Sequence, residues 1–153
     1  MLKLLRIICS TFAGVFLLQL PLQAADFNEI QSITVLSDAR LAIPLSQLAS
    51  VFTHTHMISV ASVFGASAEQ KKKIEDGEPA DLFITSNHEL IEQLKIKGLV
   101  DVHSIGNITD SKSVHFTAAV VAGENMTPAR LFLEYLKSPE AQAIFRKNGL
   151  AEP

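Results

Sequence analysis

Residues 64–84 read FGASAEQKKKIEDGEPADLFI and contain a turn, a helix and a strand in succession. The opening FGAS places small residues and a hydroxyl where the helix begins, and Ser67 with Gln70 fits a capping box. Gly77 fits the position just past the last helical turn. The apolar run that starts at Asp81 predicts a strand. Free backbone N–H groups at such a helix N-terminus suit an anion, so this turn is the first candidate for a binding site.

Strands and helices alternate along the rest of the chain. Strands are predicted at residues 32–37, 58–63, 81–85 and 114–122, with a short strand or an extended segment at 100–105. Helices are predicted between and after these strands, with Asn87, Thr127 and Ser138 as N-caps and with Pro44, Pro128 and Pro139 in first turns. This alternation predicts an α/β fold with a mostly parallel sheet covered by helices on both faces.

The parallel sheet predicts where a ligand would lie. In such sheets ligands bind beyond the carboxyl ends of the strands. That rule places Ser37 to Arg40, Gly65 to Ser67 and Ser86-Asn87 on the same rim. The convergence of three strand-to-helix turns is the strongest functional indication that comes from the residues alone.

The first 24 residues have the three parts of a secretory signal peptide. Lys3 and Arg6 give a positively charged start, and the fourteen residues 7–20 are uncharged and mostly apolar. Small residues then provide a cleavage site after Ala24 or one residue later. The apolar run is short for a membrane-spanning helix, although an uncleaved membrane anchor is the alternative. We expect residues 1–24 to be removed on export to the periplasm, which leaves residues 25–153.

Removal of that segment changes the composition in two ways. It takes away Cys9, the single cysteine, so the mature protein would have neither a disulfide nor thiol chemistry. It also removes two of the 13 basic residues and none of the 16 acidic ones, which leaves a formal net charge of −5. An acidic surface argues against a nucleic acid or an anionic lipid as the partner. A small anion remains compatible, because local N–H groups can hold it.

Most of the mature chain resembles the periplasmic molybdate-binding proteins of bacterial ABC importers. The most specific matches are FGAS at residues 64–67 and KIEDGEPADLFI at residues 73–84, and residues 129–150 resemble the family's final helices. Members of that family have two lobes that clamp an oxyanion between them. Here a short polar linker at residues 106–113 stands where the second lobe would be inserted. The resemblance therefore implies a single three-layer α/β/α lobe of a periplasmic-binding-protein-like fold.

The resemblance also implies site residues. Ser67 matches a family serine whose hydroxyl, together with backbone N–H groups such as those around Ala66, binds the oxyanion. Arg40 stands where the family has its other first-lobe serine, and Ser37 lies on the same rim. The expected ligand-binding residues are therefore Ser67, Arg40, Ser37 and Ala66. Asp38 departs from the pattern, because the family has a small residue there.

Each of these residues also has a simpler interpretation. Ser67 can be a helix cap without a ligand, a role worth about 1 kcal/mol. Arg40 can hold an oxyanion through its bidentate fork, but it can equally pair with Asp38 or lie in solvent. A carboxylate beside an anion site opposes binding by charge repulsion, which favours one of the latter two roles for Arg40.

Other polar residues give no indication of catalysis. His54 and His56 have the spacing of a metal-binding pair, but no cluster of carboxylates or cysteines accompanies them, so no metal or cofactor is expected. Asp81 is expected to accept hydrogen bonds from the preceding turn. The sequence contains no nucleophile elbow, P-loop, dinucleotide loop or paired acid–base arrangement, so we do not expect an enzyme.

Together these features predict an exported substrate-binding protein that carries a molybdate-like or tungstate-like oxyanion to an ABC permease in the inner membrane. A single open lobe leaves the anion hydrated, so we expect weak binding unless two chains pair rim to rim as a homodimer. The alternative is a degenerate one-lobe module that keeps an interaction or scaffolding role in the periplasm without binding a ligand.

Overall fold

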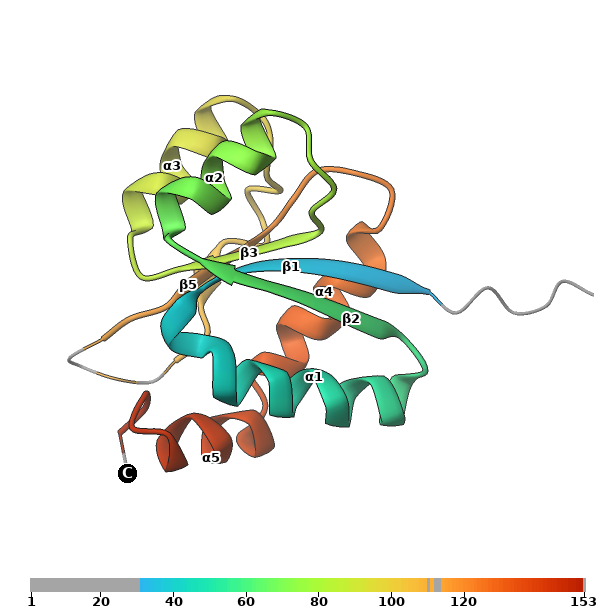
Figure 1. Ribbon diagram of the computed structural model, residues 1–153, viewed down its shortest axis with the longest axis vertical. Coiled ribbons are helices and arrows are strands. Elements are labelled where there is room, and N and C mark those ends of the chain that lie inside the picture. Colours follow the sequence, from blue (N-terminus) through green and yellow to red (C-terminus); the bar gives the residue numbers. More distant parts are fainter. Residues whose placement is uncertain (1–30, 110, 112–113, 153) are drawn as a thin grey trace, which may run out of the picture.

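A five-stranded sheet lies between two layers of helices in the computed structural model, which describes residues 31–109, 111 and 114–152 (Figure 1). The predicted signal peptide lies outside the described residues. Within them, no helix is both long and apolar enough to span a bilayer. The elements are β1 (Ser32–Asp38), the 3-10 turn η1 (Ala39–Leu41), α1 (Ala42–His56), β2 (Ser59–Gly65), α2 (Ser67–Glu75), β3 (Leu82–Thr85), α3 (His88–Ile96), β4 (Gly106–Asn107), β5 (Thr117–Val120), α4 (Met126–Leu136) and α5 (Pro139–Lys147).

The strand order in the sheet is β2-β1-β3-β5-β4. Strands β1, β2 and β3 are parallel, β5 is antiparallel to β3, and β4 is antiparallel to β5. Four of these strands therefore run in one direction, which confirms the predicted mostly parallel sheet. The carboxyl ends of β1, β2 and β3 point to the left in Figure 1, where the candidate rim lies.

Alternating side chains on the central strands divide the apolar core into two layers. Leu82 and Ile84 of β3 face the larger cluster with α1, α4 and α5, whereas Phe83 faces the smaller one with α2 and α3. Strand β5 repeats the pattern, with Ala118 and Val120 on one side and Ala119 on the other. The predicted cover of helices on both faces is thus confirmed.

Several predicted helix ends are confirmed. The Asn87 side chain accepts a hydrogen bond from the amide of Glu89, and Ser138 does the same for Ala141, with Pro139 at the first helical position. Gly77 follows α2 with a φ of 81°, a left-handed conformation that suits glycine. These signals depend on neighbours within a few residues, which is why they can be read from the sequence.

Two predicted N-caps are wrong. Helix α4 begins at Met126 with Asn125 as its N-cap, so Thr127 lies inside the helix and Pro128 is its third residue. The N–H groups of the N-cap and of the first three helical residues have no intrahelical partner, so proline is tolerated at each of those three residues and does not fix the start. Helix α2 is capped by Ala66, and Ser67 is its first residue. The Ser67 hydroxyl instead donates a hydrogen bond to the carboxylate of Asp38, the last residue of β1.

The segment after α3 differs from the prediction in detail. Strand β5 covers only Thr117–Val120 of the predicted 114–122, and residue 100 forms a single bridge with residue 121. The predicted polar linker at 106–113 contains β4, which pairs with β5. Asp81 is also placed differently, because its carboxylate accepts from the amide of Thr34 on β1 at 2.7 Å and not from the preceding turn.

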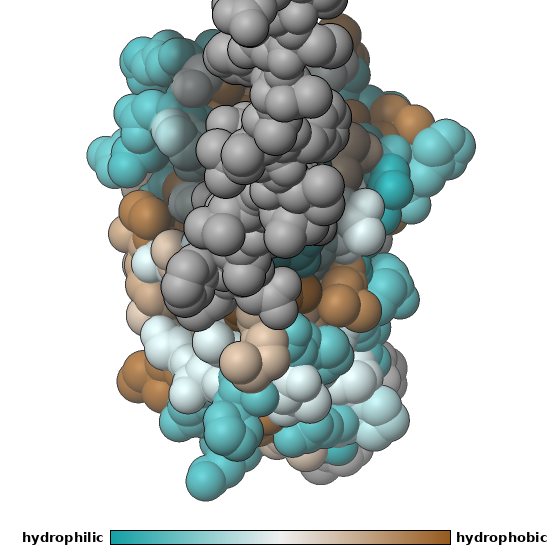
Figure 2. Space-filling model, turned by 90° about the vertical axis from the view of Figure 1, so that its right-hand side faces the viewer, coloured by the Kyte–Doolittle hydropathy of each residue, from teal (hydrophilic) through white to brown (hydrophobic). Residues whose placement is uncertain are grey.

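Figure 2 shows the face opposite the rim, where polar and apolar residues are interspersed around those drawn in grey.

Candidate functional site

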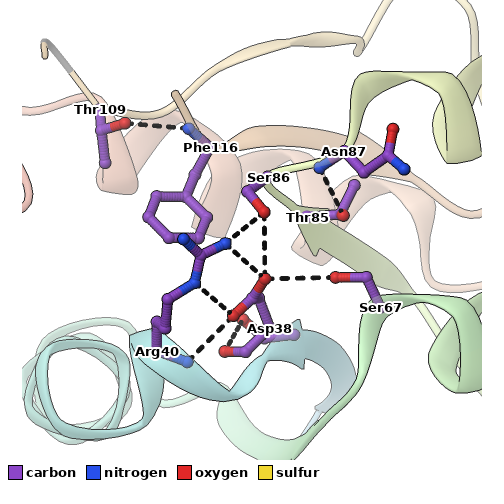
Figure 3. A network of polar contacts seen from close by, with 9 residues as sticks. Asp38, Arg40, Ser67, Thr85, Ser86, Asn87, Thr109 and Phe116 are labelled. Atoms are coloured by element: carbon purple, nitrogen blue, oxygen red, sulfur yellow. Dashed lines mark hydrogen bonds and ion pairs between the residues drawn. The ribbon is translucent and has the colours of Figure 1, made fainter. Parts of the chain in front are cut away.

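Three strand-to-helix turns meet at the rim. In the parallel register, Asp38 at the end of β1 lies beside Gly65 at the end of β2, and Ser37 lies beside Ile84 near the end of β3. The residues that follow these ends converge, as the sequence predicts. Their polar side chains form a connected group that we call the rim cluster: Asp38, Arg40, Ser67 and Ser86 (Figure 3).

The Asp38 carboxylate is at the centre of the rim cluster and accepts five hydrogen bonds. Its Oδ1 accepts from the backbone amide of Arg40 at 3.0 Å and from Arg40 Nε at 3.1 Å. Its Oδ2 accepts from Arg40 Nη2 at 2.9 Å, from Ser86 Oγ at 3.2 Å and from Ser67 Oγ at 3.3 Å. One short side chain therefore joins all three turns.

Arg40 is held from two sides. On one side, its guanidinium donates hydrogen bonds to both carboxylate oxygens of Asp38 and to Ser86 Oγ. On the other side, its Cζ lies 5.0 Å from the centre of the Phe116 ring (Figure 3). Phe116 is fully buried, and its amide donates to Thr109 Oγ1 at 3.1 Å. A cation over an aromatic face is attracted by the ring quadrupole. Although half of the Arg40 side chain is exposed, its position is defined by these contacts.

The charges of the rim cluster stabilise each other. Arg40 is the main cause that lowers the pKa of Asp38 from 3.8 to about 2, although partial burial of the carboxylate acts in the opposite direction. The same hydrogen-bonded contact raises the pKa of Arg40. Asp38 is therefore ionised throughout the physiological pH range.

The other residues expected in the site lie beside the rim cluster and not in it. Ser37 is fully buried, and its hydroxyl donates to the backbone carbonyl of Asp38 at 3.4 Å. Ala66 is exposed as the N-cap of α2 and provides no side-chain acceptor to the first-turn amides. The Asn87 side chain is engaged as the cap of α3.

Sequence reasoning missed two contributors to the cluster. Ser86 was placed on the rim but not among the ligand-binding residues, although its hydroxyl contacts both charged groups. The role of Phe116 under the guanidinium has no sequence signal, because that residue reads only as part of an apolar strand.

The rim cluster is a surface site, and two surface hollows of about 480 and 460 Å³ lie elsewhere, one between α1 and β2 and the other beside β4 and α5.

Comparison with known proteins identifies the family. The family model described as "Bacterial extracellular solute-binding protein" matches residues 33–114 and 106–151. The chain belongs to this family. The description of the family is that of proteins that bind solutes outside the bacterial cell. The two matched segments overlap at residues 106–114, the stretch that holds β4 and the predicted linker.

Solved structures share the fold at low sequence identity. A substrate-binding domain assigned to a molybdenum ABC transporter of Clostridium difficile aligns with a TM-score of 0.72 and 13% identity, over 77% of this chain and 97% of that one. The periplasmic molybdate-binding protein of Azotobacter vinelandii gives 0.71 and 12%, over 79% and 99%. The sulfate-binding protein of Mycobacterium tuberculosis gives 0.67 and 15%, over 78% and 86%. No curated protein sequence matches the chain.

Proposed function

We propose that the protein is the exported substrate-binding protein of an ABC importer and that it binds a tetrahedral oxyanion at the rim cluster. One observation carries this proposal: Arg40, Ser67 and Ser86, from three separate turns, all direct hydrogen-bond donors at a single anionic group. A guanidinium fork and two hydroxyls are the donors that an oxyanion requires. The carboxylate of Asp38 shows that this arrangement accommodates a negative charge.

The relatives support the choice of ligand class. Two of the structures that share the fold are named for molybdenum or molybdate, and a third is named for sulfate. Molybdate and sulfate are both tetrahedral oxyanions. The corresponding expectation for this chain is a molybdate-like or tungstate-like anion, delivered in the periplasm to an inner-membrane permease. Residues 1–24 would direct the export, and no cofactor is required for binding.

We further propose that the chain is a single lobe, with residues 106–113 in place of a second one. The support is that the family match consists of two segments that meet at these residues. One open lobe leaves a bound anion in contact with water, where its attraction to Arg40 is screened. Weak binding by the monomer follows, and pairing of two chains rim to rim would exclude that water.

A second function is favoured by the same cluster. The Asp38 carboxylate already satisfies the donors, so the lobe can be stable without any ligand. This favours a periplasmic interaction or scaffolding module that has lost solute binding.

Calorimetric titration distinguishes the two functions. Residues 25–153, which contain the described residues, are titrated with molybdate, tungstate, sulfate and phosphate, beside Ser67→Ala and a control, Ser50→Ala, at an exposed position on α1. Oxyanion binding predicts heat that Ser67→Ala reduces and Ser50→Ala leaves unchanged. A folded protein, verified by circular dichroism, that binds none of the four anions would favour the interaction module.

A further inference from the structure

The position of Asp38 in the rim cluster differs from that of an ordinary surface ion pair. A local pair would need only Arg40, two residues away, yet Asp38 Oδ2 also accepts from Ser67 and Ser86, which are 29 and 48 positions distant in the chain. The side chain of Asp38 is 13% exposed, whereas that of Arg40 is 52% exposed. The carboxylate, and not the guanidinium, is thus the shielded group that the other residues surround.

The donors that an external anion would need are the ones that Asp38 uses. Both carboxylate oxygens are engaged by the Arg40 fork, and the only two serine hydroxyls of the cluster point at Oδ2 (Figure 3). An oxyanion that took the same donors would have to lie against the carboxylate. Like charges at that distance repel strongly, so the two anions cannot share the cluster.

We propose that Asp38 is an internal ligand, which occupies the oxyanion position and must leave it before an external oxyanion can bind. This inference rests on the proposed function, because it describes how the same site is regulated. Asp38 then sets the affinity: the solute has to compete with a carboxylate that is covalently tethered at the site, and part of its binding free energy is spent on displacing that carboxylate.

The surroundings of Asp38 allow such a displacement. It is the last residue of β1 and has a short side chain, so its carboxylate can rotate away at the cost of the bond from the Arg40 amide that caps η1. The exposed Arg40 can follow an incoming anion, and each serine hydroxyl can rotate toward it.

The decisive variant is Asp38→Ala, which removes the internal anion and leaves Arg40, Ser67 and Ser86 in place. Calorimetry with molybdate and with sulfate is expected to show binding at least about tenfold tighter than for the unchanged protein, a gain of about 1.4 kcal/mol. Asp38→Asn removes the charge but keeps an acceptor, so its gain should be smaller. Asp76→Ala is the matched control: it makes the same change in net charge at the exposed far end of α2, and should leave the affinity unchanged.

The outcomes separate this inference from the proposed function. If the unchanged protein binds an anion and Ser67→Ala weakens it, but Asp38→Ala binds equally or less well, the inference is overturned and the proposed function stands. If neither the unchanged protein nor Asp38→Ala binds any of the anions while both are folded, the proposed function fails as well. Should Asp38→Ala not fold, Asp38→Ser decides, because its hydroxyl can still accept the bond from the Arg40 amide that caps η1.

Discussion

The Asp38 carboxylate should make the stability of the protein depend on pH in a way that Asp38→Asn removes. The folded-state pKa of Asp38 is lowered to about 2 from 3.8, so the unfolded chain takes up the proton at a higher pH than the folded one. The stabilisation is therefore fully present above about pH 4 and is lost as the pH falls toward 2. The unfolding free energies of Asp38→Asn and of the unchanged protein should differ most at pH 7 and least at pH 2.

The magnitude follows from that difference in pKa. One pKa unit corresponds to about 1.4 kcal/mol, so the lowering of the Asp38 pKa gives an upper limit of about 2.5 kcal/mol. Half of the Arg40 side chain is exposed, and solvent screens an ion pair of that kind. We therefore expect the unchanged protein to exceed Asp38→Asn by about 1 kcal/mol in unfolding free energy at pH 7.

Urea unfolding followed by circular dichroism at pH 7, 5, 4, 3 and 2 measures the effect. Other carboxylates titrate in both proteins and cancel in the difference. When both proteins also carry Arg40→Gln, the difference in unfolding free energy between them should be smaller at pH 7, because Arg40 is the main cause of the lowered pKa of Asp38. A gap that stays constant between pH 7 and pH 2, or that widens on acidification, would refute the reasoning.

Two further predictions concern the framework of the sheet. Asp81→Ala removes the acceptor of the Thr34 amide at 2.7 Å and should lower the unfolding free energy by about 1–3 kcal/mol, measured by urea unfolding. Asp81→Asn keeps an acceptor oxygen and should lower it less. Equal losses in the two variants would contradict this role of Asp81. Gly77→Ala forces a side chain into a φ of 81° and should lower stability by about 1–2 kcal/mol. Gly123→Ala, with open space around it and no left-handed φ, should stay within about 0.5 kcal/mol, and a similar loss at both glycines would argue against backbone strain.

Features with local causes were predictable from the sequence. The caps at Asn87 and Ser138 and the glycine at Gly77 each depend on groups a few residues away. The convergence of the turns was also predictable, because the ends of parallel strands share one edge of the sheet whatever the strand order.

Features that depend on distant partners were not predictable. Ser67 has the sequence environment of an N-cap, but Ala66 takes that position and the Ser67 hydroxyl donates to a carboxylate 29 positions away, at the end of β1. The contacts of Ser86 with Arg40 and Asp38 join residues 46 and 48 positions apart. The sequence indicated that Asp38 would oppose an anion, but only the structure shows that its carboxylate accepts hydrogen bonds from Arg40, Ser67 and Ser86 together.

The larger apolar cluster also determines when folding can be completed. Phe52 of α1 packs edge-on against Phe132 of α4, with ring centres 4.8 Å apart, and Phe145 of α5 belongs to the same cluster. The first helix therefore packs against the sheet on one side, but its contacts with helices form only with the last two. A growing chain exposes the part of α1 that packs against α4 and α5 until nearly all of the sequence has been made, so a fragment that ends before α4 should aggregate or be degraded.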